Sequence, residues 1–474
     1  MKHIFILCGI ILYNIGQVQA GEKYRYTNTV YDPYIKTVTL EVGNNPVSFP
    51  ILQLNSGQFF IIKFDDLLNE ERNLFYRIVH CDKDWTPSRL TEIEYIQGFN
   101  DERLRNYDYS ANTKVQYIHY WQRFPNRDTR WKVSGNYLLI IYEDNIDNPL
   151  LTRRFIVNEN RVDINITGTF PADVGNIRYK QEMLMDINYE KFKMRNPVDE
   201  ITMLVMQNED WNNTVEAKPS FAVGNLLRFN RVGIFQFFGN AEYREFDIRS
   251  IYSTGRGVQK VDRGNKYTDV FLKTSESRYN KPHLLAFDLN GKFFIQNFEG
   301  FTNRTMDDVI SGFAGSIGSD PNLRQTLRDS IVKSLILSNP LLESANRAED
   351  RNIRSDYAHV IFSLQVPNHL EDNDIYIIGG MNDWEPREEF RMKYDPDEDL
   401  YTGEALLKQG YYNYYYAIKA GDGTLDYRSL EGSWTETEND YNALIYYRGF
   451  GELYDRVIGY NKFNTEFFNT RINR

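Results

Sequence analysis

Ile375–Glu385 reads IYIIGGMNDWE, a β-branched and aromatic run that stops at two glycines and continues into a polar loop. Further along, residues 410–419 read GYYNYYYAIK. Short aromatic and β-branched runs separated by Gly, Asn and Asp are typical of β-strands joined by turns. In the second run, Tyr412, Tyr414 and Tyr416 fall on one face of a strand, while aromatic side chains also occupy the other face. This pattern predicts a strand that is either covered on both sides or has an exposed aromatic face.

The same alternation of short strands and turns continues on both sides of this stretch. With 474 residues, 34 Tyr and 30 Phe, the chain is long enough for about three β-rich domains. We therefore expect a mainly β protein with about three sandwich domains of the immunoglobulin or early-set type in a row, and a helical pair inserted before the last. The predicted segments are an N-terminal sandwich at 28–158, a second sandwich at 161–299, a helical insertion and linker at 302–355, and a C-terminal sandwich at 357–460.

The predicted insertion is the one segment with helical periodicity. Met306, Val309, Ile310 and Phe313 recur at helical spacing, and Asp320-Pro321 is a good start for a second helix. The pair is interpreted either as amphipathic helices packed on a neighbouring sandwich or as an arm that binds a partner.

The N-terminus has the features of an export signal. Lys2-His3 precedes an apolar run, Ile4–Leu12, and Val18-Gln19-Ala20 is a small-residue cleavage site, so residues 1–20 are predicted to be a signal peptide. The apolar run is short for a membrane span. After cleavage Cys81 would be the one remaining cysteine, which excludes an intrachain disulfide in the mature chain. The expected protein is exported and soluble.

The formal net charge of −11 argues against nonspecific binding of nucleic acid and against docking on anionic lipid. No short motif predicts catalysis. The five histidines of the expected mature chain have no metal-ligand spacing. The acidic run Asp395–Asp399 could suggest calcium, but it lacks the spaced ligands of a calcium loop, and a solvated hairpin turn is the favoured interpretation. We therefore predict no catalytic, cofactor-binding or metal-binding residues.

Several phrases of the sequence resemble the type IX secretion system plug protein family. They include HCDKDW at 80–85, QNEDW at 207–211 and the closing segment TENDY at 437–441. This resemblance implies a non-enzymatic periplasmic protein that lies on the inner face of the outer membrane. There it binds the large β-barrel translocon of the secretion system and seals its periplasmic opening when no cargo is passing.

Arg and aromatic side chains are enriched at the energetic centres of protein interfaces. The predicted partner-binding residues are accordingly Trp384, Trp434, Tyr441, Arg448 and Arg456. For the two arginines, ion pairing with nearby acids such as Glu452 or Asp455 is an equally open interpretation.

A second hypothesis follows from the segment around Ile375–Lys419, which resembles the early-set sandwiches that accompany starch- and glycogen-active enzymes. Trp384 and Trp434 could stack on a sugar ring. The alternative function is therefore an exported accessory protein that binds or helps to process a polysaccharide.

Overall fold

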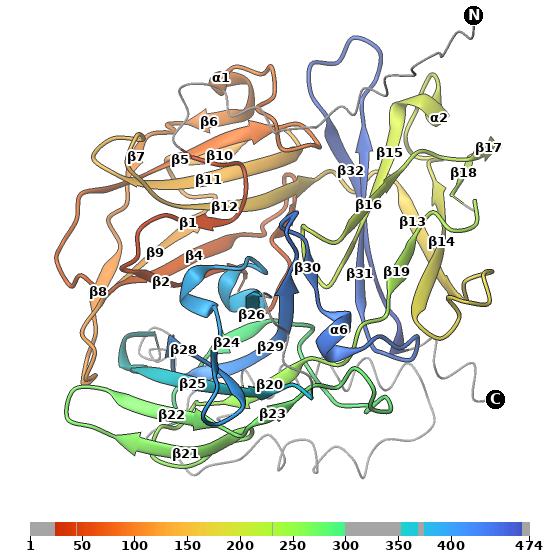
Figure 1. Ribbon diagram of the computed structural model, residues 1–474. Coiled ribbons are helices and arrows are strands. Elements are labelled where there is room, and N and C mark those ends of the chain that lie inside the picture. Colours follow the sequence, from red (N-terminus) through yellow and green to blue (C-terminus); the bar gives the residue numbers. More distant parts are fainter. Residues whose placement is uncertain (1–23, 44, 230, 299–351, 368–373, 467–474) are drawn as a thin grey trace, which may run out of the picture.

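The computed structural model describes residues 24–43, 45–229, 231–298, 352–367 and 374–466. Strands arranged in several sheets dominate it, and the sheets pack in pairs to form three β-sandwiches (Figure 1). The predicted mainly β, multi-sandwich fold is confirmed. The predicted signal peptide and most of the predicted helical insertion lie outside the described residues.

The first sandwich is formed by the N-terminal third of the chain. Its two main sheets enclose one apolar core, and a two-stranded sheet lies at one end. One main sheet has the order β1 (Thr29–Val30), β12 (Pro149–Asn158), β11 (Gly135–Glu143), β5 (Leu74–Cys81), β7 (Glu102–Arg103), with β3 (Ile51–Gln53) beside β12; the other has the order β2 (Ile35–Val42), β4 (Phe60–Asp66), β9 (Ile118–Phe124), β8 (Tyr107–Tyr109); β6 (Ile96–Gly98) pairs with β10 (Thr129–Trp131), and α1 (Glu92–Tyr95) precedes β6.

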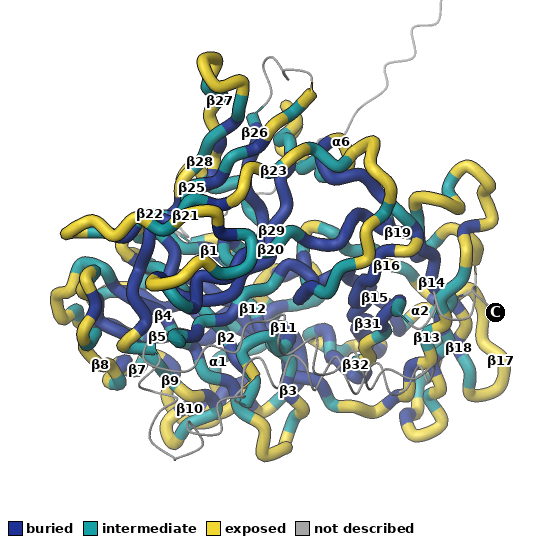
Figure 2. Tube along the Cα trace, turned by 90° about the horizontal axis from the view of Figure 1, so that it is seen from below, coloured by how far each residue is buried: buried dark blue, intermediate teal, exposed yellow. Residues whose placement is uncertain are grey.

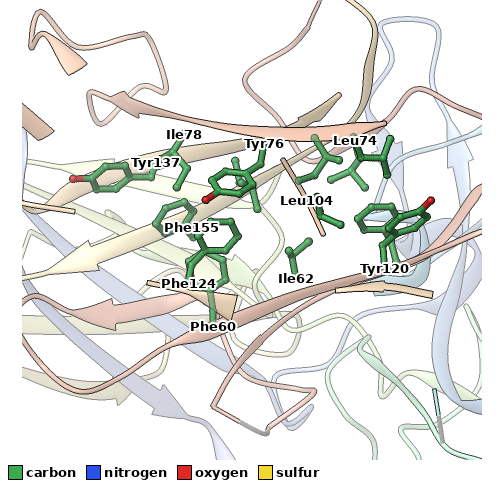
Figure 3. Packing of buried hydrophobic residues seen from close by; sticks show 14 of the residues in the cluster. Phe60, Ile62, Leu74, Tyr76, Ile78, Leu104, Tyr120, Phe124, Tyr137 and Phe155 are labelled. Atoms are coloured by element: carbon green, nitrogen blue, oxygen red, sulfur yellow. The ribbon is translucent and has the colours of Figure 1, made fainter. Parts of the chain in front are cut away.

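Aromatic rings fill the middle of this first core (Figure 3). Phe60 is completely buried, and its ring centroid lies 4.7 Å from that of Phe155 and 5.3 Å from that of Phe124. Trp131 stacks on Phe60 at 5.8 Å. Alternation along β4 explains the arrangement, because Phe60, Ile62 and Phe64 face inward while the residues between them are only partly buried.

The second sandwich combines strands from two distant parts of the chain. One sheet comes entirely from the middle of the sequence, and the other is completed by the last two strands. The first has the order β13 (Asp163–Thr169), β14 (Lys180–Asn188), β18 (Leu226–Phe229), β17 (Phe221–Val223), with β19 (Gln236–Phe238) also on β14; the second has the order β16 (Thr214–Ala217), β15 (Ile201–Gln207), β31 (Asp440–Tyr447), β32 (Arg456–Asn464), and α2 (Pro197–Glu200) precedes β15.

The third sandwich is formed by the segment between those two parts. Its core includes Phe246, Phe362 and the inward tyrosines of β29. One sheet has β29 (Gly410–Lys419) paired with β20 (Arg244–Asp247), β24 (Phe293–Ile295), β26 (Asp374–Ile378) and β30 (Leu425–Asp426); the other has the order β21 (Val258–Arg263), β22 (Thr268–Leu272), β25 (Tyr357–Gln365), β28 (Leu400–Lys408), β27 (Lys393–Asp395), with β23 (Ser275–Glu276) on β25; the short helices are η2 (Gly380–Asn382), η3 (Glu388–Phe390) and α6 (Arg428–Glu431).

The strand pairing crosses the boundaries that we drew from the sequence at 299 and 357. Ile201 of β15 pairs with Tyr447 of β31, so the C-terminal strands belong to the second sandwich. Arg244 of β20 pairs with Tyr414 of β29, so part of the predicted second domain lies in the third sandwich. The third sandwich is thus inserted into the second one. A two-residue repeat shows that a strand exists but does not show which distant strand it pairs with.

Two local predictions about the C-terminal part can be compared with the structure. Every residue of β29 from Gly410 to Ala417 is buried, which selects the covered strand over the exposed aromatic face. Asp395–Asp399 connects β27 to β28, which pair in antiparallel register, so this acidic run forms the hairpin turn that we favoured.

Polar contacts join the first sandwich to the third. Lys408 of β28 places its Nζ 2.5 Å from Asp65 Oδ2 of β4, and each side chain is 1% exposed. The hydroxyl of Tyr357 also donates to Asp65 Oδ2, at 2.6 Å, and His119 Nδ1 lies 2.6 Å from Oδ1. Burial opposes the charge of Asp65, but Lys408 and His119 outweigh it and hold the pKa of its carboxyl below the ordinary value.

Lys292 connects all three sandwiches. It precedes β24 of the third sandwich, forms an ion pair with Glu209 of the second, and donates from Nζ to the carbonyl of Val47 in the first at 2.9 Å. An apolar cluster that includes Phe49, Ile156, Leu204 and Tyr446 fills the contact between the first and second sandwiches. Figure 2 shows buried chain continuing from one sandwich to the next. The three units are therefore packed together as one body.

Candidate functional site

Both predicted tryptophan sites are half-buried and belong to the third sandwich and its exit segment. Trp384 follows η2 and packs beside Tyr376, Ile378 and Tyr427. Its backbone φ is +55°, a left-handed conformation that is rare for a bulky residue. Trp434 lies in the segment that returns to the second sandwich, and its backbone N–H donates to the carbonyl of Asn240 at 2.9 Å. Both therefore have structural contacts, and partner contact by either stays a prediction.

Tyr441 is a correction to the predicted interface. Its side chain is completely buried in β31, where the hydroxyl lies 2.7 Å from Gln181 Oε1 and accepts a hydrogen bond from Gln207 Nε2 at 2.9 Å. Burial raises the pKa of Tyr441 far above its ordinary value, so the hydroxyl stays neutral. Such a side chain holds the two sheets of the second sandwich together and offers no surface to another protein.

Arg448 and Arg456 flank the hairpin between β31 and β32 and form ion pairs within the chain. Arg448 Nη1 lies 3.1 Å from Asp82 and 3.4 Å from Asp455, and Arg456 binds Glu159 through two nitrogens at 2.7 and 2.8 Å. Asp82 and Glu159 belong to the first sandwich or its end. The ion-pairing interpretation is thereby confirmed, because Arg448 pairs with the expected Asp455 and Arg456 with the expected Glu452. The further partners Asp82 and Glu159 are distant in the sequence and could not be predicted from it. Partner contact by the exposed parts of these arginines stays a prediction.

The tryptophans of the resembling phrases lie at the contact between the first two sandwiches. Trp85 and Trp211 meet edge to face with ring centroids 4.9 Å apart. The guanidinium of Arg154 lies 4.3 Å from the Trp85 centroid and 5.2 Å from the Trp211 centroid. Cation–π and edge-to-face contacts of this kind favour one relative orientation of the two sandwiches. These residues therefore help to fix how the two sandwiches meet.

A cavity of about 790 Å³ opens where the second and third sandwiches meet the N-terminal segment. Its lining mixes aromatic rings, amides, three arginines and three carboxylates. The lining residues are Arg25, Asp210, Asn212, Asn213, Phe238, Asn240, Trp384, Glu385, Pro386, Arg387, Asp422, Gly423, Thr424, Leu425, Tyr427 and Arg428. Of the predicted site residues only Trp384 lies here. The balanced charge of the lining suits a polar, uncharged ligand or a peptide better than an ion.

Asp210 is the most perturbed carboxyl of this cavity. Burial raises its pKa from 3.8 to about 6, although the backbone N–H of Asn212 donates to its Oδ1 at 2.8 Å. Burial likewise raises the pKa of Glu385. A raised pKa means that the folded state disfavours the charged carboxylate, and such groups are common at functional sites.

Asp210→Asn is expected to stabilise the protein at high pH. The folded-state pKa of about 6 exceeds the unfolded value of 3.8, so the folded protein binds the proton of Asp210 more tightly than the unfolded chain does. The stability that this proton contributes is fully present below pH 3.8 and is lost as the pH rises through 6. The Asn variant lacks this penalty, so at pH 8 its free energy of unfolding should be higher by about 2–3 kcal/mol, with little difference at pH 4. Urea titrations at the two pH values measure the effect. Asp422→Asn, an exposed carboxyl of the same cavity, is the control and should give no gain.

Several exposed apolar side chains belong to the outer sheet of the second sandwich and to its loops. Its edge strand β17 has three exposed residues in a row, with Phe221 41% and Val223 56% exposed. Figure 2 shows this strand at one end of the molecule. The exposed large apolar residues of this sheet and its loops are Phe170, Val174, Ile177, Tyr179, Phe221, Val223 and Val232. We call this set the outer-sheet surface. Exposed apolar groups on an unpaired edge mark an interaction surface.

Sequence reasoning missed the outer-sheet surface. Phe221-Ala222-Val223 reads as an ordinary short strand, and only the strand order shows that β17 lies at the edge of its sheet, with no strand paired to its outer side among the described residues. A signal was present in the loop Phe170–Tyr179, where four large apolar residues occur in a turn-rich segment. Such residues have no core to enter when a loop runs over the surface.

The fold defines a class of protein: a mainly β protein of three sandwiches, with exposed apolar residues on the edge strand of one of its sheets. None of the helices in the described ranges has the length and apolar character needed to cross a bilayer. Residues 35–159 match the family model described as the type 9 secretion system plug protein 1st domain. The first sandwich therefore matches this family, which confirms the resemblance seen in the sequence and suggests a role in the type IX secretion system.

The chain is extensively similar to a solved structure. A hypothetical protein from Parabacteroides merdae ATCC 43184, solved by crystallography, shares 26% identity with a TM-score of 0.78, over 93% of this chain and 100% of that chain. The C-terminal domain of the Streptococcus pyogenes antigen I/II-family protein AspA gives a TM-score of 0.15 at 10% identity, over 43% of this chain and 89% of that chain, which is too low to support an argument. No curated protein matches the chain.

Proposed function

We propose that this protein is a non-enzymatic plug of the type IX secretion system. It acts in the periplasm after removal of residues 1–20, binds the outer-membrane translocon, and seals its periplasmic opening when no cargo is passing. The observation that carries the proposal is the match of the first sandwich, residues 35–159, to the plug domain. The similarity over 93% of the chain to one solved structure supports treating the three sandwiches as a single functional unit.

The packing of the sandwiches supports an occluding role. A plug must resist deformation, because a hinge between its parts would let solutes pass. Lys292 and the buried Asp65–Lys408 pair hold the three sandwiches to one another. Buried polar pairs require a defined geometry, so they favour one arrangement over many. Such a body can cover an opening wider than any single side chain could close.

The outer-sheet surface is the proposed contact with the translocon. An exposed edge strand can extend a sheet of the partner, while its apolar side chains supply contact area. The double substitution Phe221→Asp with Val223→Asp places two carboxylates on this edge. We expect it to reduce capture of the translocon from detergent-solubilised outer membranes by about tenfold or more.

The matched control is Leu284→Asp with Leu285→Asp, since these residues are 73% and 74% exposed but belong to the third sandwich. The control should leave capture unchanged. Equal loss with both variants, each folded by circular dichroism, would reject the outer-sheet surface. If the unmodified protein captured no outer-membrane translocon, and its deletion left membrane permeability unchanged, the plug function itself would be wrong.

One observation favours glycan binding as a second candidate function. Trp384 and Tyr427 line the same cavity as Asn212, Asn213 and Asn240, and aromatic faces beside amide groups suit a sugar ring. Trp384→Ala should then abolish retardation of the protein in native gels that contain glycogen. Unchanged mobility of the unmodified protein with and without glycogen would exclude this alternative.

A further inference from the structure

Three acidic side chains meet at the connections between the second and third sandwiches. Ligand oxygens of Glu242, Asp288 and Glu438 all lie within 4.8 Å of one another. The three residues are 2%, 1% and 6% exposed. We call these residues the acidic cluster. Because they are far apart in the chain, only the fold brings them together.

The position of the acidic cluster is specific. Glu242 precedes β20, where the chain leaves the second sandwich, and Glu438 precedes β31, where the chain returns to it. Asp288 lies in the turn that leads to β24 of the third sandwich. The backbone N–H of Glu438 donates to Glu242 Oε1 at 3.2 Å, so the outgoing and returning segments are adjacent. A group bound here would hold both connections at once.

The side chain of Asn290 is a second, independent observation that favours a ligand at the acidic cluster. Its side chain is 1% exposed, and its carboxamide oxygen Oδ1 is buried without a hydrogen-bond partner. The nitrogen of the same carboxamide, Nδ2, lies 3.2 Å from Glu438 Oε1, so the group is at the acidic cluster. A buried carbonyl oxygen without a donor is costly, and native proteins rarely leave one. A cation at the cluster would satisfy it.

Charge balance points in the same direction. Three carboxylates this close in a buried site repel one another, and a cation bound between them would relieve that repulsion. The imidazole of His283 faces them, with its Nε2 3.4 Å from Glu242 Oε1. Backbone N–H groups and an amide also contact the cluster: Tyr243 N donates to Asp288 Oδ2, Asn290 N to Asp288 Oδ1, and Asn464 Nδ2 to Glu438.

We propose that Glu242, Asp288, Glu438 and the Asn290 carboxamide bind one hard divalent cation, Ca²⁺ in preference to Mg²⁺. All the candidate ligand atoms are oxygens, which select hard cations over zinc or copper. Ca²⁺ has ligands at about 2.3–2.6 Å, so two ligands on opposite sides of it lie about 5 Å apart, which fits the spacing of the cluster. The bound ion would hold together the two chain segments, before β20 and before β31, that connect the third sandwich to the second.

Calcium titration of the full-length protein, stripped with EDTA, tests the site. Isothermal titration calorimetry should show one Ca²⁺ per chain. Thermal unfolding in about 1 mM CaCl₂ should have a midpoint about 5 °C or more above that in EDTA, with a smaller rise in MgCl₂. No bound Ca²⁺ together with an unchanged midpoint would overturn the proposal, and so would a response to Mg²⁺ without one to Ca²⁺.

Glu242→Gln separates a cation site from a merely structural cluster. The glutamine keeps an acceptor for the Glu438 N–H but removes one charge. In EDTA the variant should unfold at the same temperature as the unmodified protein or higher, because repulsion is relieved; in CaCl₂ it should unfold lower, because a ligand is lost. Asp397→Asn, in the exposed acidic hairpin turn, should keep the full calcium response. A calcium response that survives in Glu242→Gln or disappears in Asp397→Asn would contradict the assignment.

Discussion

Lys408→Met is expected to lower the free energy of unfolding by about 3–5 kcal/mol, which is the usual cost of removing one partner of a buried ion pair. Lys408 Nζ lies 2.5 Å from Asp65 Oδ2 and 4.1 Å from the centroid of the Tyr117 ring. Methionine fills a similar volume but leaves the carboxylate of Asp65 buried with His119 and Tyr357 as its remaining partners. Urea unfolding followed by circular dichroism measures the loss.

Two further variants test whether burial of the Lys408–Asp65 pair causes the loss of stability in Lys408→Met. Lys36 also pairs across the contact between the first and third sandwiches, with Glu389, but these side chains are 19% and 43% exposed. Lys36→Met should therefore cost at most about 1 kcal/mol. The double variant Lys408→Met with Asp65→Asn should recover part of the stability, because the uncompensated charge is gone. Equal losses for Lys36→Met and Lys408→Met would show that burial does not govern this contact.

Phe60→Ala should cost about 3–5 kcal/mol, because it removes a completely buried ring from the aromatic group at the centre of the first core (Figure 3). The rings of Phe124, Trp131 and Phe155 all lie within 5.8 Å of the Phe60 centroid and would border the cavity. Differential scanning calorimetry and tryptophan fluorescence should both report the decrease.

Phe60→Ala also tests whether the sandwiches unfold together. If the contacts among them couple the three units, a single transition should shift as a whole. An isolated early transition of the first sandwich would contradict that coupling. Phe99→Ala, at a residue that is 68% exposed, should change stability by no more than about 0.5 kcal/mol.

The sequence predicted local structure well because local structure depends on nearby residues. The strands of the first sandwich extend from Thr29 to Asn158, and strands of this kind follow from the alternation and turn residues in that segment. The hairpin turn at Asp395–Asp399 and the buried β29 also follow from short patterns. The plug-family resemblance was equally accessible, since its phrases are contiguous.

Long-range pairing could not be predicted in this way. Tyr441 shows the reason: an aromatic residue after a polar run suits either an interface or a core, and only the pairing of β15 with β31 buries it. Of the two acidic partners of Arg456, the sequence predicted one. Glu452 is four residues away, whereas Glu159 is brought in by the fold. The acidic cluster is the extreme case, because its members come from three separate segments and no spacing in the sequence relates them.

The insertion of the third sandwich into the second has a consequence for biogenesis. A polypeptide that crosses a membrane with its N-terminus leading would deliver β15 long before β31, the strand that pairs with it. Until residues 440–447 arrive, β15 has a hydrogen-bonding edge that nothing in the emerged chain satisfies, and such edges recruit other strands. Newly exported molecules would therefore need a chaperone for as long as the whole inserted sandwich takes to emerge, and a chain cut short before β31 would be cleared by proteases instead of reaching any partner.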